Sequence, residues 1–380
     1  MVAHSELAFR TLAFEHGATL AYTPMMHAKH FAASANYRSG NFDFDPSIEG
    51  AAHGRPVIAQ IAANDPELAS QAVRILASTG VDGIDLNLGC PQGIARKGNY
   101  GAFLLPQTSK VEAVLSAMVA ASDGVPITAK VRIQDDLEST LRICKAIQST
   151  GVSLLTVHGR TRENNKTNLS PASHEAIRAV VESLDIPVVA NGGVERPEDV
   201  PAILESTGAA GVMSSEKLLE LPSLFAPGAV GDAELTELEV MERQLALTRE
   251  YLVIAAEHFP ISYGGAGGAN CVKSHVFKMM YRLLDLPPCH GLRAKLGGMK
   301  DRNYDVSNVA AVVEEVAALL HDERRPLLTN ESVSWYRRHR RPQAPPPTIG
   351  SVGTMSERKA RIRERVEKLR ADRITTAATD

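Results

Sequence analysis

Short apolar segments alternate with amphipathic segments of helical length between residues 20 and 213. The apolar segments are rich in Val, Ile and Leu, which is typical of buried parallel strands. Parallel strands need crossover helices, so this alternation predicts an α/β sheet. We expect strands at Leu20–Tyr22, Val57–Ile61, Ile84–Leu88, Ile127–Val131, Leu154–Val157, Val188–Ala190 and Gly211–Met213.

The segments between these strands carry signals for helix starts and ends. Several open at Asp, Ser or Pro, and several are followed by Gly, the residues preferred at the two ends of a helix. We expect helices at Ser5–His16, Pro66–Ser78, Ser109–Ser122, Leu137–Ser149, Ala172–Ser183 and Glu198–Ser206.

Seven strands after a leading helix favour a TIM (β/α)8 barrel that lacks its first strand upstream of Met1. The alternative is an open, doubly wound sheet. Polar residues at the carboxyl end of almost every strand favour the barrel, because barrel enzymes place their chemistry there. No GxGxxG phosphate-binding segment follows any of the strands, which disfavours a dinucleotide-binding fold.

Beyond residue 233 the pattern changes to long amphipathic helices, which predicts a separate helical domain. A glycine-rich stretch, Gly264–Gly268, links the first two helices and is expected to form a loop. We place the barrel at residues 1–232, the helical domain at 233–330 and a basic, proline-containing tail at 331–380. The expected helices are Glu234–His258, Val272–Asp285 and Val306–Asp322, with a charged helix at Glu357–Arg373 in the tail.

Charge is unevenly distributed along the chain. The formal net charge is −3, yet Trp335–Arg373 holds 12 Lys and Arg against 4 Asp and Glu. Such a segment is typical of nucleic-acid contact, of a nuclear address, or of a solvated helix with Arg–Glu pairs, and the sequence leaves these open.

Two classes of protein are disfavoured by the rest of the composition. The apolar stretches are shorter than about 18 residues and no signal-peptide pattern opens the chain, so we expect no membrane partner and a cytoplasmic, also nuclear, location. The four cysteines form no CxxC pair. We therefore expect no disulfide framework and no metal.

The strongest chemical signal lies between Asp85 and Gln92. An apolar strand ends in Asn87, and a Gly-Cys-Pro turn then places Cys90 on a loop at the strand's carboxyl end. A packing cysteine is commoner inside a strand or helix, whereas a loop thiol is a candidate nucleophile or acid. By its position alone, Cys90 is explained equally well as catalytic or as structural.

Polar residues also end the later strands. Lys130 and Arg132 share one face of a strand by alternation, and its apolar flanks favour an anionic or ring-shaped partner over a sheet-edge position. His158 ends the next strand, although a structural histidine is the alternative. Asn191-Gly192-Gly193 leaves bare backbone N–H groups before a helix, which suits a phosphate, although Gly-Gly turns are common.

These strand ends converge on one pocket in a barrel, and convergence is a stronger signal than any single residue. A pocket of this kind is typical of barrels that hold a phosphorylated cofactor such as FMN. The converging residues are Gln60, Asn87, Cys90, Lys130, His158, Asn191, Gly192, Gly193 and Ser214–Glu216.

Five segments together resemble the tRNA-dihydrouridine synthases. They are DLNLGCPQ with the downstream GAFLL, then TAKVRI, LLTVHGRT, ANGG and GVMSSE, in this order and spacing. The likeness runs from Ser5 to about Leu224 and continues more weakly through Leu328. AYTPM followed by NYR is most similar to the eukaryotic branch that acts on uridines 16 and 17 of the tRNA D-loop.

The resemblance implies an FMN-dependent oxidoreductase that reduces uridine in tRNA to 5,6-dihydrouridine, with NADPH or NADH as the reductant. Cys90 matches the family's general acid, which protonates C5 of uracil after hydride reaches C6. The helical domain matches the one that clamps tRNA, and we expect a monomer. The matched cofactor residues are Gln60, Lys130 and His158 for the flavin ring and Asn191, Gly192, Gly193, Ser215 and Glu216 for its phosphate. Asn87 and Arg132 match positions near the uracil.

The sequence departs from the family pattern at two places. The first strand is absent, so we expect weak FMN binding and lower stability. Lys217 and the residues after it stand where relatives carry Gly and Asn, and we expect them to crowd the phosphate loop. Two other functions remain open: a different FMN-dependent barrel reductase of small pyrimidines, and a truncated, non-catalytic tRNA-binding protein.

Overall fold

The structure is a computed structural model that describes residues 4–164, 170–261, 268–299, 305–321 and 334–337. The described residues all belong to one compact unit. The helix expected at Glu357–Arg373 lies outside the described residues. Within the described part, none of the helices is both long and apolar enough to span a bilayer.

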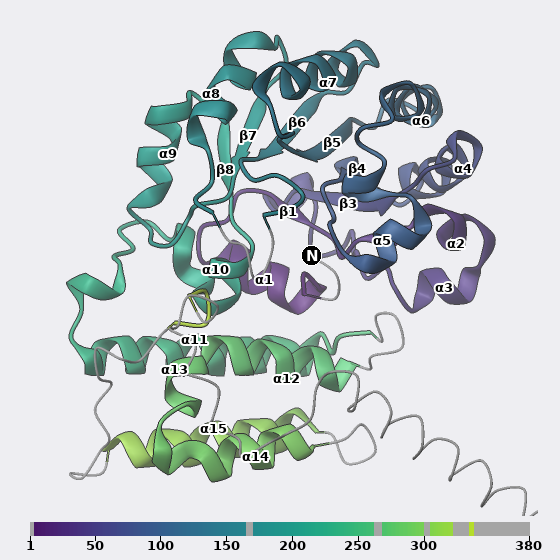
Figure 1. Cartoon of the computed structure of the whole chain (residues 1–380). Helices are drawn as coiled ribbons and strands as arrows, with labels where there is room; N and C mark the ends of the chain where they lie inside the picture. Colours follow the sequence, from purple (N-terminus) through teal and green to yellow (C-terminus); the bar gives the residue numbers. More distant parts are fainter. Residues whose placement is uncertain (1–3, 165–169, 262–267, 300–304, 322–333, 338–380) are drawn as a thin grey trace, which may run out of the picture. The chain divides into compact units, whose positions relative to one another are not determined.

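A parallel sheet lies at the centre of the first part of the chain (Figure 1). Its strands are β1 (Ala21–Tyr22), β2 (Met26–His27), β3 (Val57–Ala62), β4 (Gly83–Leu88), β5 (Ile127–Arg132), β6 (Leu154–His158), β7 (Val188–Asn191) and β8 (Gly211–Met213). They follow the order β1-β3-β4-β5-β6-β7-β8, with β2 also paired to β3. Sequential neighbours in parallel are the arrangement of a TIM barrel, so the expected fold class is confirmed.

The seven expected strands all form, and β2 is an addition that the sequence pattern did not reveal. This strand has only two residues and pairs with Ile61 and Ala62 at the end of β3. Its pairing depends on β3, so no local alternation of apolar and polar residues marks it. Among the described residues no ladder joins β8 to β1, and the sheet is open there.

Helices cover the sheet along its length (Figure 1). They are α2 (Ala28–Ala33), α3 (Ala35–Ser39), α4 (Pro66–Ala77), α5 (Gly93–Gly98), α6 (Thr108–Ala121), α7 (Leu137–Ser149), α8 (His174–Ser183), α9 (Asp199–Thr207) and α10 (Glu216–Glu220). Side chains of Asp65, Asp136 and Ser173 cap α4, α7 and α8 by accepting a backbone N–H. These caps are the start signals that the sequence displays.

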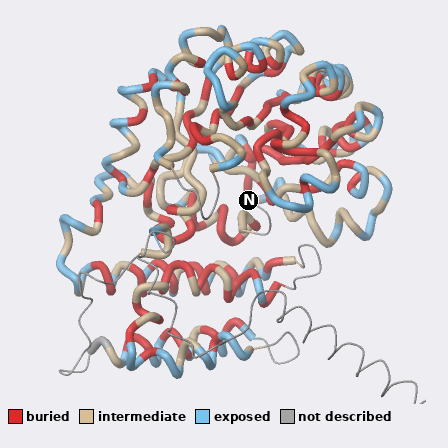
Figure 2. Tube along the Cα trace, in the orientation of Figure 1, coloured by how far each residue is buried: buried red, intermediate tan, exposed pale blue. Residues whose placement is uncertain are grey.

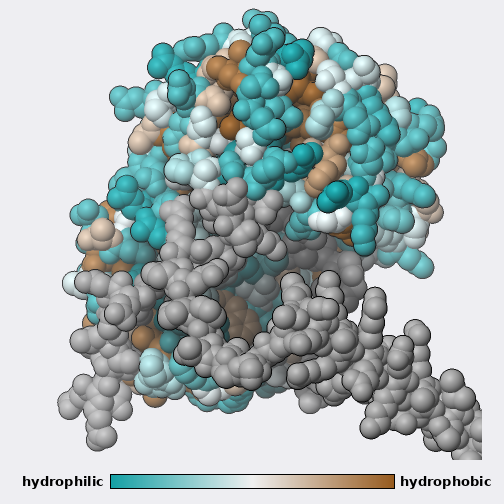
Figure 3. Space-filling model, in the orientation of Figure 1, coloured by the Kyte–Doolittle hydropathy of each residue, from teal (hydrophilic) through white to brown (hydrophobic). Residues whose placement is uncertain are grey.

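The barrel core is built from the strands and the inner faces of their helices. Every residue of β3 is buried, as is most of β4 and β5, and Figure 2 shows a buried centre. Burial on both faces is the reason why these strands are continuously apolar and not alternating. The face of the described residues visible in Figure 3 is mostly hydrophilic, with some apolar patches.

The residues after 233 form helices α11 (Glu237–Glu257), α12 (Gly268–Met279), α13 (Tyr281–Leu284), α14 (His290–Gly298) and α15 (Val306–His321). The single helix expected at Val272–Asp285 is wrong, because the chain leaves helical geometry at Met280, where φ is −96° and ψ is 16°. Gly268 belongs to α12 and not to the expected loop. The rest of that glycine-rich stretch, residues 264–267, lies outside the described residues.

Helix α1 (Leu7–Glu15) packs in the core of this helical region. Its buried residues Ala8, Phe9 and Leu12 belong to the same apolar cluster as residues of α11, α12 and α15. The N-terminal helix, which precedes the sheet in sequence, therefore ties the barrel chain to the helices that follow the barrel.

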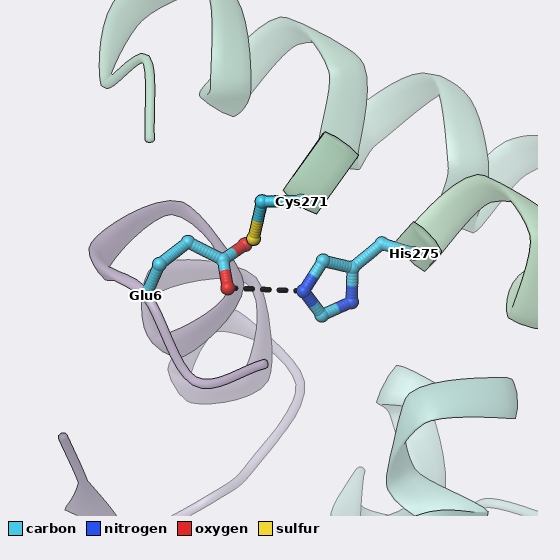
Figure 4. Close-up of side chains that lie close together, drawn as sticks. All are labelled: Glu6, Cys271 and His275. Carbon is cyan, nitrogen blue, oxygen red and sulfur yellow. Dashed lines mark hydrogen bonds and ion pairs between the residues drawn. The ribbon is translucent and has the colours of Figure 1, made fainter. Parts of the chain in front are cut away.

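A buried carboxylate strengthens this connection (Figure 4). Glu6 is fully buried, and its two oxygens lie 2.8 Å from the Tyr251 hydroxyl and 3.0 Å from Nε2 of His275. The thiol of Cys271 lies close to the Glu6 carboxylate and the His275 ring. Burial alone would raise the pKa of Glu6, but the charge and hydrogen bond of His275, with other hydrogen bonds, outweigh it and hold this pKa at about 2.

We predict that Glu6→Gln lowers the free energy of unfolding by about 1–3 kcal/mol, because it removes the carboxylate that the buried Tyr251 hydroxyl and His275 ring contact. Glu15→Gln is the matched control: Glu15 ends the same helix and pairs with Arg55 at the surface, and its loss should cost at most about 1 kcal/mol. Urea denaturation of both variants measures the difference. Equal losses would contradict a special contribution from Glu6.

Candidate active site

The carboxyl ends of β3 to β7 lie beside one another because the strands are parallel and in register. Lys130 pairs with Asn87 on one side and with Thr156 on the other. His158 is likewise the register partner of Arg132 and of Asn191. Most of the polar residues expected at the site therefore share one edge of the sheet.

The loop that carries Cys90 is fixed by hydrogen bonds from both sides. Oδ1 of Asn87 accepts the N–H groups of Gly89 and Cys90 at 3.1 and 2.9 Å. The carbonyl of Cys90 accepts the N–H of Ala102 at 3.1 Å. Cys90 is half-buried, whereas the other three cysteines are buried. The chain thus presents one accessible thiol in a fixed position.

Gly101 allows the close contact on the second side of this loop. Its φ is +61°, and a Cβ at this position would lie 2.8 Å from the Cys90 carbonyl oxygen and 3.0 Å from its Cβ. Any larger residue would therefore push against the thiol-bearing residue and also strain the backbone.

A series of hydrogen-bonded side chains holds Asn87 in position. The Asn87 amide donates to Gln60 at 3.0 Å, and the Gln60 amide donates to Asp85 at 2.9 Å. Thr128 donates to the other Asp85 oxygen at 2.8 Å. Burial raises the pKa of Asp85, and the hydrogen bonds from Thr128 and Gln60 oppose this. Asn87 and Gln60, expected beside uracil and flavin, are here engaged with each other.

Asp85 was missed by reasoning from the sequence. It lies inside an apolar strand and is fully buried, where an acidic residue is rare without partners. That rarity was the available signal. Its partners come from two other strands, so the sequence alone could not show what the carboxylate holds.

Lys130 is the central cation of the site. Its ammonium donates to Oδ1 of Asn191 at 2.7 Å, and the Asn191 amide donates to the Met213 carbonyl at 2.8 Å. Burial, with a smaller contribution from Arg132, lowers the pKa of Lys130 to about 8. An ammonium whose hydrogen-bond partner is a neutral amide is well suited to an electron-rich or anionic ligand.

His158 lies close to Lys130 and is neutral. Burial and the neighbouring cations Lys130 and Arg132 hold its pKa well below the ordinary value. Its Nε2 is buried and has no hydrogen-bond partner among the described residues. A buried orphan nitrogen is costly, and a ligand that offers a hydrogen bond would satisfy it.

Arg132 holds two loops together. Its Nε donates to the Gly89 carbonyl at 2.8 Å, and its Nη1 donates to the Thr161 carbonyl at 2.9 Å. Because Gly89 precedes the thiol, this side chain connects the Cys90 loop to the loop after β6. Its expected contact with uracil stays a prediction.

Two glycines follow β7, so the backbone there carries no side chains. Gly192 and Gly193 have φ values of +102° and +87°, and a Cβ at Gly192 would lie 2.8 Å from the His158 ring. Ser215 and Glu216 begin α10 beyond β8. The Asn191–Met213 hydrogen bond joins the ends of β7 and β8, and the segments with the expected phosphate residues continue from these two ends.

Lys217, which we expect to crowd the phosphate loop, lies in α10. The Lys217 ammonium is buried and pairs with Glu220 at 3.2 Å, one helical turn further on. Glu220 also accepts the backbone N–H groups of Trp335 and Tyr336, both at 3.2 Å. Glu220 therefore binds the segment that contains Trp335 and Tyr336.

Comparison with known proteins decides the family. Residues 1–284 match the family model described as dihydrouridine synthase (Dus). The chain belongs to the dihydrouridine synthase family. In this family member, Cys90 and the polar strand ends occupy the mouth of the barrel that the sequence predicts.

Curated relatives agree with this membership. The chain is 39% identical over 313 residues to the Mus musculus protein named tRNA-dihydrouridine(16/17) synthase [NAD(P)(+)]-like, covering 82% of this chain and 59% of the relative. It is 37% identical over 325 residues to the Saccharomyces cerevisiae tRNA-dihydrouridine(16/17) synthase [NAD(P)(+)], covering 83% and 73%. The chain thus spans about three fifths of the length of the mouse relative.

We predict that Gly101→Ala destabilises the protein by about 1–3 kcal/mol, because the new Cβ meets Cys90 at a strained φ. Gly93→Ala is the control: it begins α5 nearby, and a Cβ there meets nothing within 4 Å. Its effect should stay within about 0.5 kcal/mol. Unfolding in urea measures both, and a harmless Gly101→Ala would show that the Cys90 loop is not tightly fixed.

Proposed function

We propose that this protein is a tRNA-dihydrouridine synthase that reduces a D-loop uridine to 5,6-dihydrouridine with FMN and NAD(P)H. The observation that carries the proposal is the Cys90 thiol, held by Asn87 and Gly101 beside the strand ends of Lys130 and His158. The names of the mouse and yeast relatives favour uridines 16 and 17 as the targets.

The residues around this thiol fit FMN. The Lys130 ammonium and the orphan Nε2 of His158 suit the carbonyl and nitrogen atoms of a flavin ring. Gly192 and Gly193 offer backbone without side chains, which suits a phosphate. When bound, FMN supplies the hydride for C6 of uracil after NAD(P)H has reduced it.

Cys90 supplies the proton in this proposal. Reduction of the uracil C5=C6 bond needs a proton at C5 as well as a hydride at C6. The half-buried thiol can deliver this proton and regain one from water. Asn87 and Arg132 position the thiol through the backbone of residues 89 and 90.

The remaining protein groups keep the site ready for this chemistry. Neutral His158 can donate or accept a hydrogen bond without adding a charge. Lys130 provides a positive charge that stabilises an electron-rich ring. A uridine must leave its stack in the tRNA to reach these groups, so contacts with the tRNA backbone and its shape supply the binding.

The proposal is tested with the purified chain, FMN, NADPH and unmodified tRNA transcripts. Dihydrouridine, measured by mass spectrometry after nuclease digestion, is the expected product. Binding of tRNA without any product would instead support the non-catalytic tRNA-binding function. Reduction of free pyrimidines without reduction of tRNA would support the small-molecule reductase.

We predict that Cys90→Ala leaves reduction of bound FMN by NADPH unchanged and lowers the rate of dihydrouridine formation by about 10²–10⁴-fold. The flavin absorbance follows the first reaction, and mass spectrometry follows the second. An unchanged product rate would exclude Cys90 as the acid.

We predict that the affinity for FMN decreases as pH rises above about 8. The Lys130 pKa is lowered to about 8, so the ammonium that would face the cofactor loses its proton above this pH. Quenching of flavin fluorescence should show a Kd that rises several-fold between about pH 7 and 9.5. Lys130→Met should bind more weakly with a flat profile, while exposed Lys145→Met keeps the wild-type profile. A pH-dependent Lys130→Met would contradict the assignment.

A further inference from the structure

A pocket of about 460 Å³ lies beside the Cys90 loop and is not used by the proposed mechanism. Its volume falls within the usual range of ligand sites, about 300–1,000 Å³. Three segments of the barrel mouth contribute to it: the Cys90 loop with α5, the turn at Gly101–Phe103, and the loop after β6. The lining residues are Pro91, Arg96, Phe103, Arg162 and Glu163.

The pocket has a planar wall of the kind that stacks on a nucleobase. The Arg162 guanidinium lies over the Phe103 ring at 5.0 Å from its centroid. Phe103 and Cys90 both pack against the small apolar cluster that contains Tyr100. Bases in RNA sites commonly stack on aromatic rings and on Arg guanidinium planes.

The polar groups of the pocket select among the bases. Glu163 accepts a hydrogen bond from Nε of Arg162 at 2.8 Å, which keeps a carboxylate next to the stacking plane. The Watson–Crick edge of guanine presents two adjacent N–H donors, which match the two oxygens of a carboxylate. Uracil, cytosine and adenine place an acceptor beside their donor, and this acceptor would face the carboxylate. Arg96 can donate to O6 or N7 of guanine.

Pro91 directly follows Cys90, so an occupant of this pocket lies next to the thiol. When the target uracil is at Cys90, the nearest base along the RNA is that of a neighbouring nucleotide. We propose that the pocket binds a guanine base adjacent to the target uridine and that Glu163 recognises it. This inference rests on the proposed function, and it assigns part of the substrate preference to the loop after β6.

The test uses RNA stem-loops in which guanosine flanks the target uridine, with inosine replacing guanosine on one side at a time. Inosine lacks only the N2 amine that the carboxylate would accept. The wild-type holoenzyme should show a roughly tenfold lower kcat/KM for the inosine substrate at one of the two sides. For Glu163→Gln the guanosine and inosine substrates should differ by less than about twofold, because the carboxylate is gone.

Glu138→Gln is the matched control, since Glu138 is an exposed acid in a surface pair with Arg142 on α7. It should keep the wild-type preference for guanosine. Equal guanosine preference in Glu163→Gln and in the wild type would overturn the proposal. The proposal would also be overturned if Glu163→Gln altered the KM for NADPH in flavin reduction without RNA, because the pocket would then bind the reductant.

Fluorescence anisotropy with the same stem-loops separates this inference from the proposed function. If the wild type binds the guanosine RNA more tightly than the inosine RNA, and Glu163→Gln does not, the pocket reads guanine whether or not dihydrouridine forms. If dihydrouridine forms without any preference between the two RNAs in rate or affinity, the proposed function stands and this inference fails.

Discussion

The parallel register of β3 to β7 is the constraint on which the site depends. Each strand contributes polar residues, and those on different strands are far apart in the sequence. Register places Lys130 between Asn87 and Thr156, and His158 between Arg132 and Asn191. A shift of one residue in any strand would turn its polar residue to the opposite face of the sheet. The apolar residues of the strands, buried on both faces, fix this register and thereby the chemistry.

Within this frame, buried polar groups determine how the thiol is presented. Asp85, Gln60 and Asn87 form a continuous series of hydrogen bonds that ends at the N–H of Cys90. Because each buried group that loses its partner costs free energy, the series favours one arrangement of the loop. Nε2 of His158 is among the buried atoms that have no hydrogen-bond partner within the described residues. Side chains held by hydrogen bonds, next to a buried nitrogen that lacks a hydrogen-bond partner, are suited to bind a ligand.

Contacts distant in sequence also join the barrel chain to segments that follow it. Glu6 meets Tyr251 and His275, and Glu220 meets the backbone of Trp335 and Tyr336. Both carboxylates look unremarkable in the sequence, where Glu6 precedes a helix and Glu220 ends one. Their importance comes from burial, which makes each charge dependent on the partners that surround it.

The sequence by itself determined the elements of the barrel and the residues at their ends. Strand and helix patterns depend on local periodicity and caps, so β3 to β8 and helices such as α7 appear where they are predicted. It also determined that Cys90 lies on a loop after a strand, because the Gly-Cys-Pro turn is a local signal. The break at Met280 and the two-residue strand β2 escaped prediction, since packing of distant segments decides them.

Only the tertiary structure decided what the polar side chains touch. It directs Asn87 and Arg132 to the backbone of the Cys90 loop and Lys217 to Glu220. It also shows that Asp85 supports the site and that Arg162 lies over Phe103. Some of these pairs, such as Arg132 with Gly89 and Gln60 with Asp85, join residues that are far apart in the chain, and their geometry depends on the register and burial of the whole sheet. A local pattern can show that a residue is polar and placed at a strand end, but not which partner it finds there.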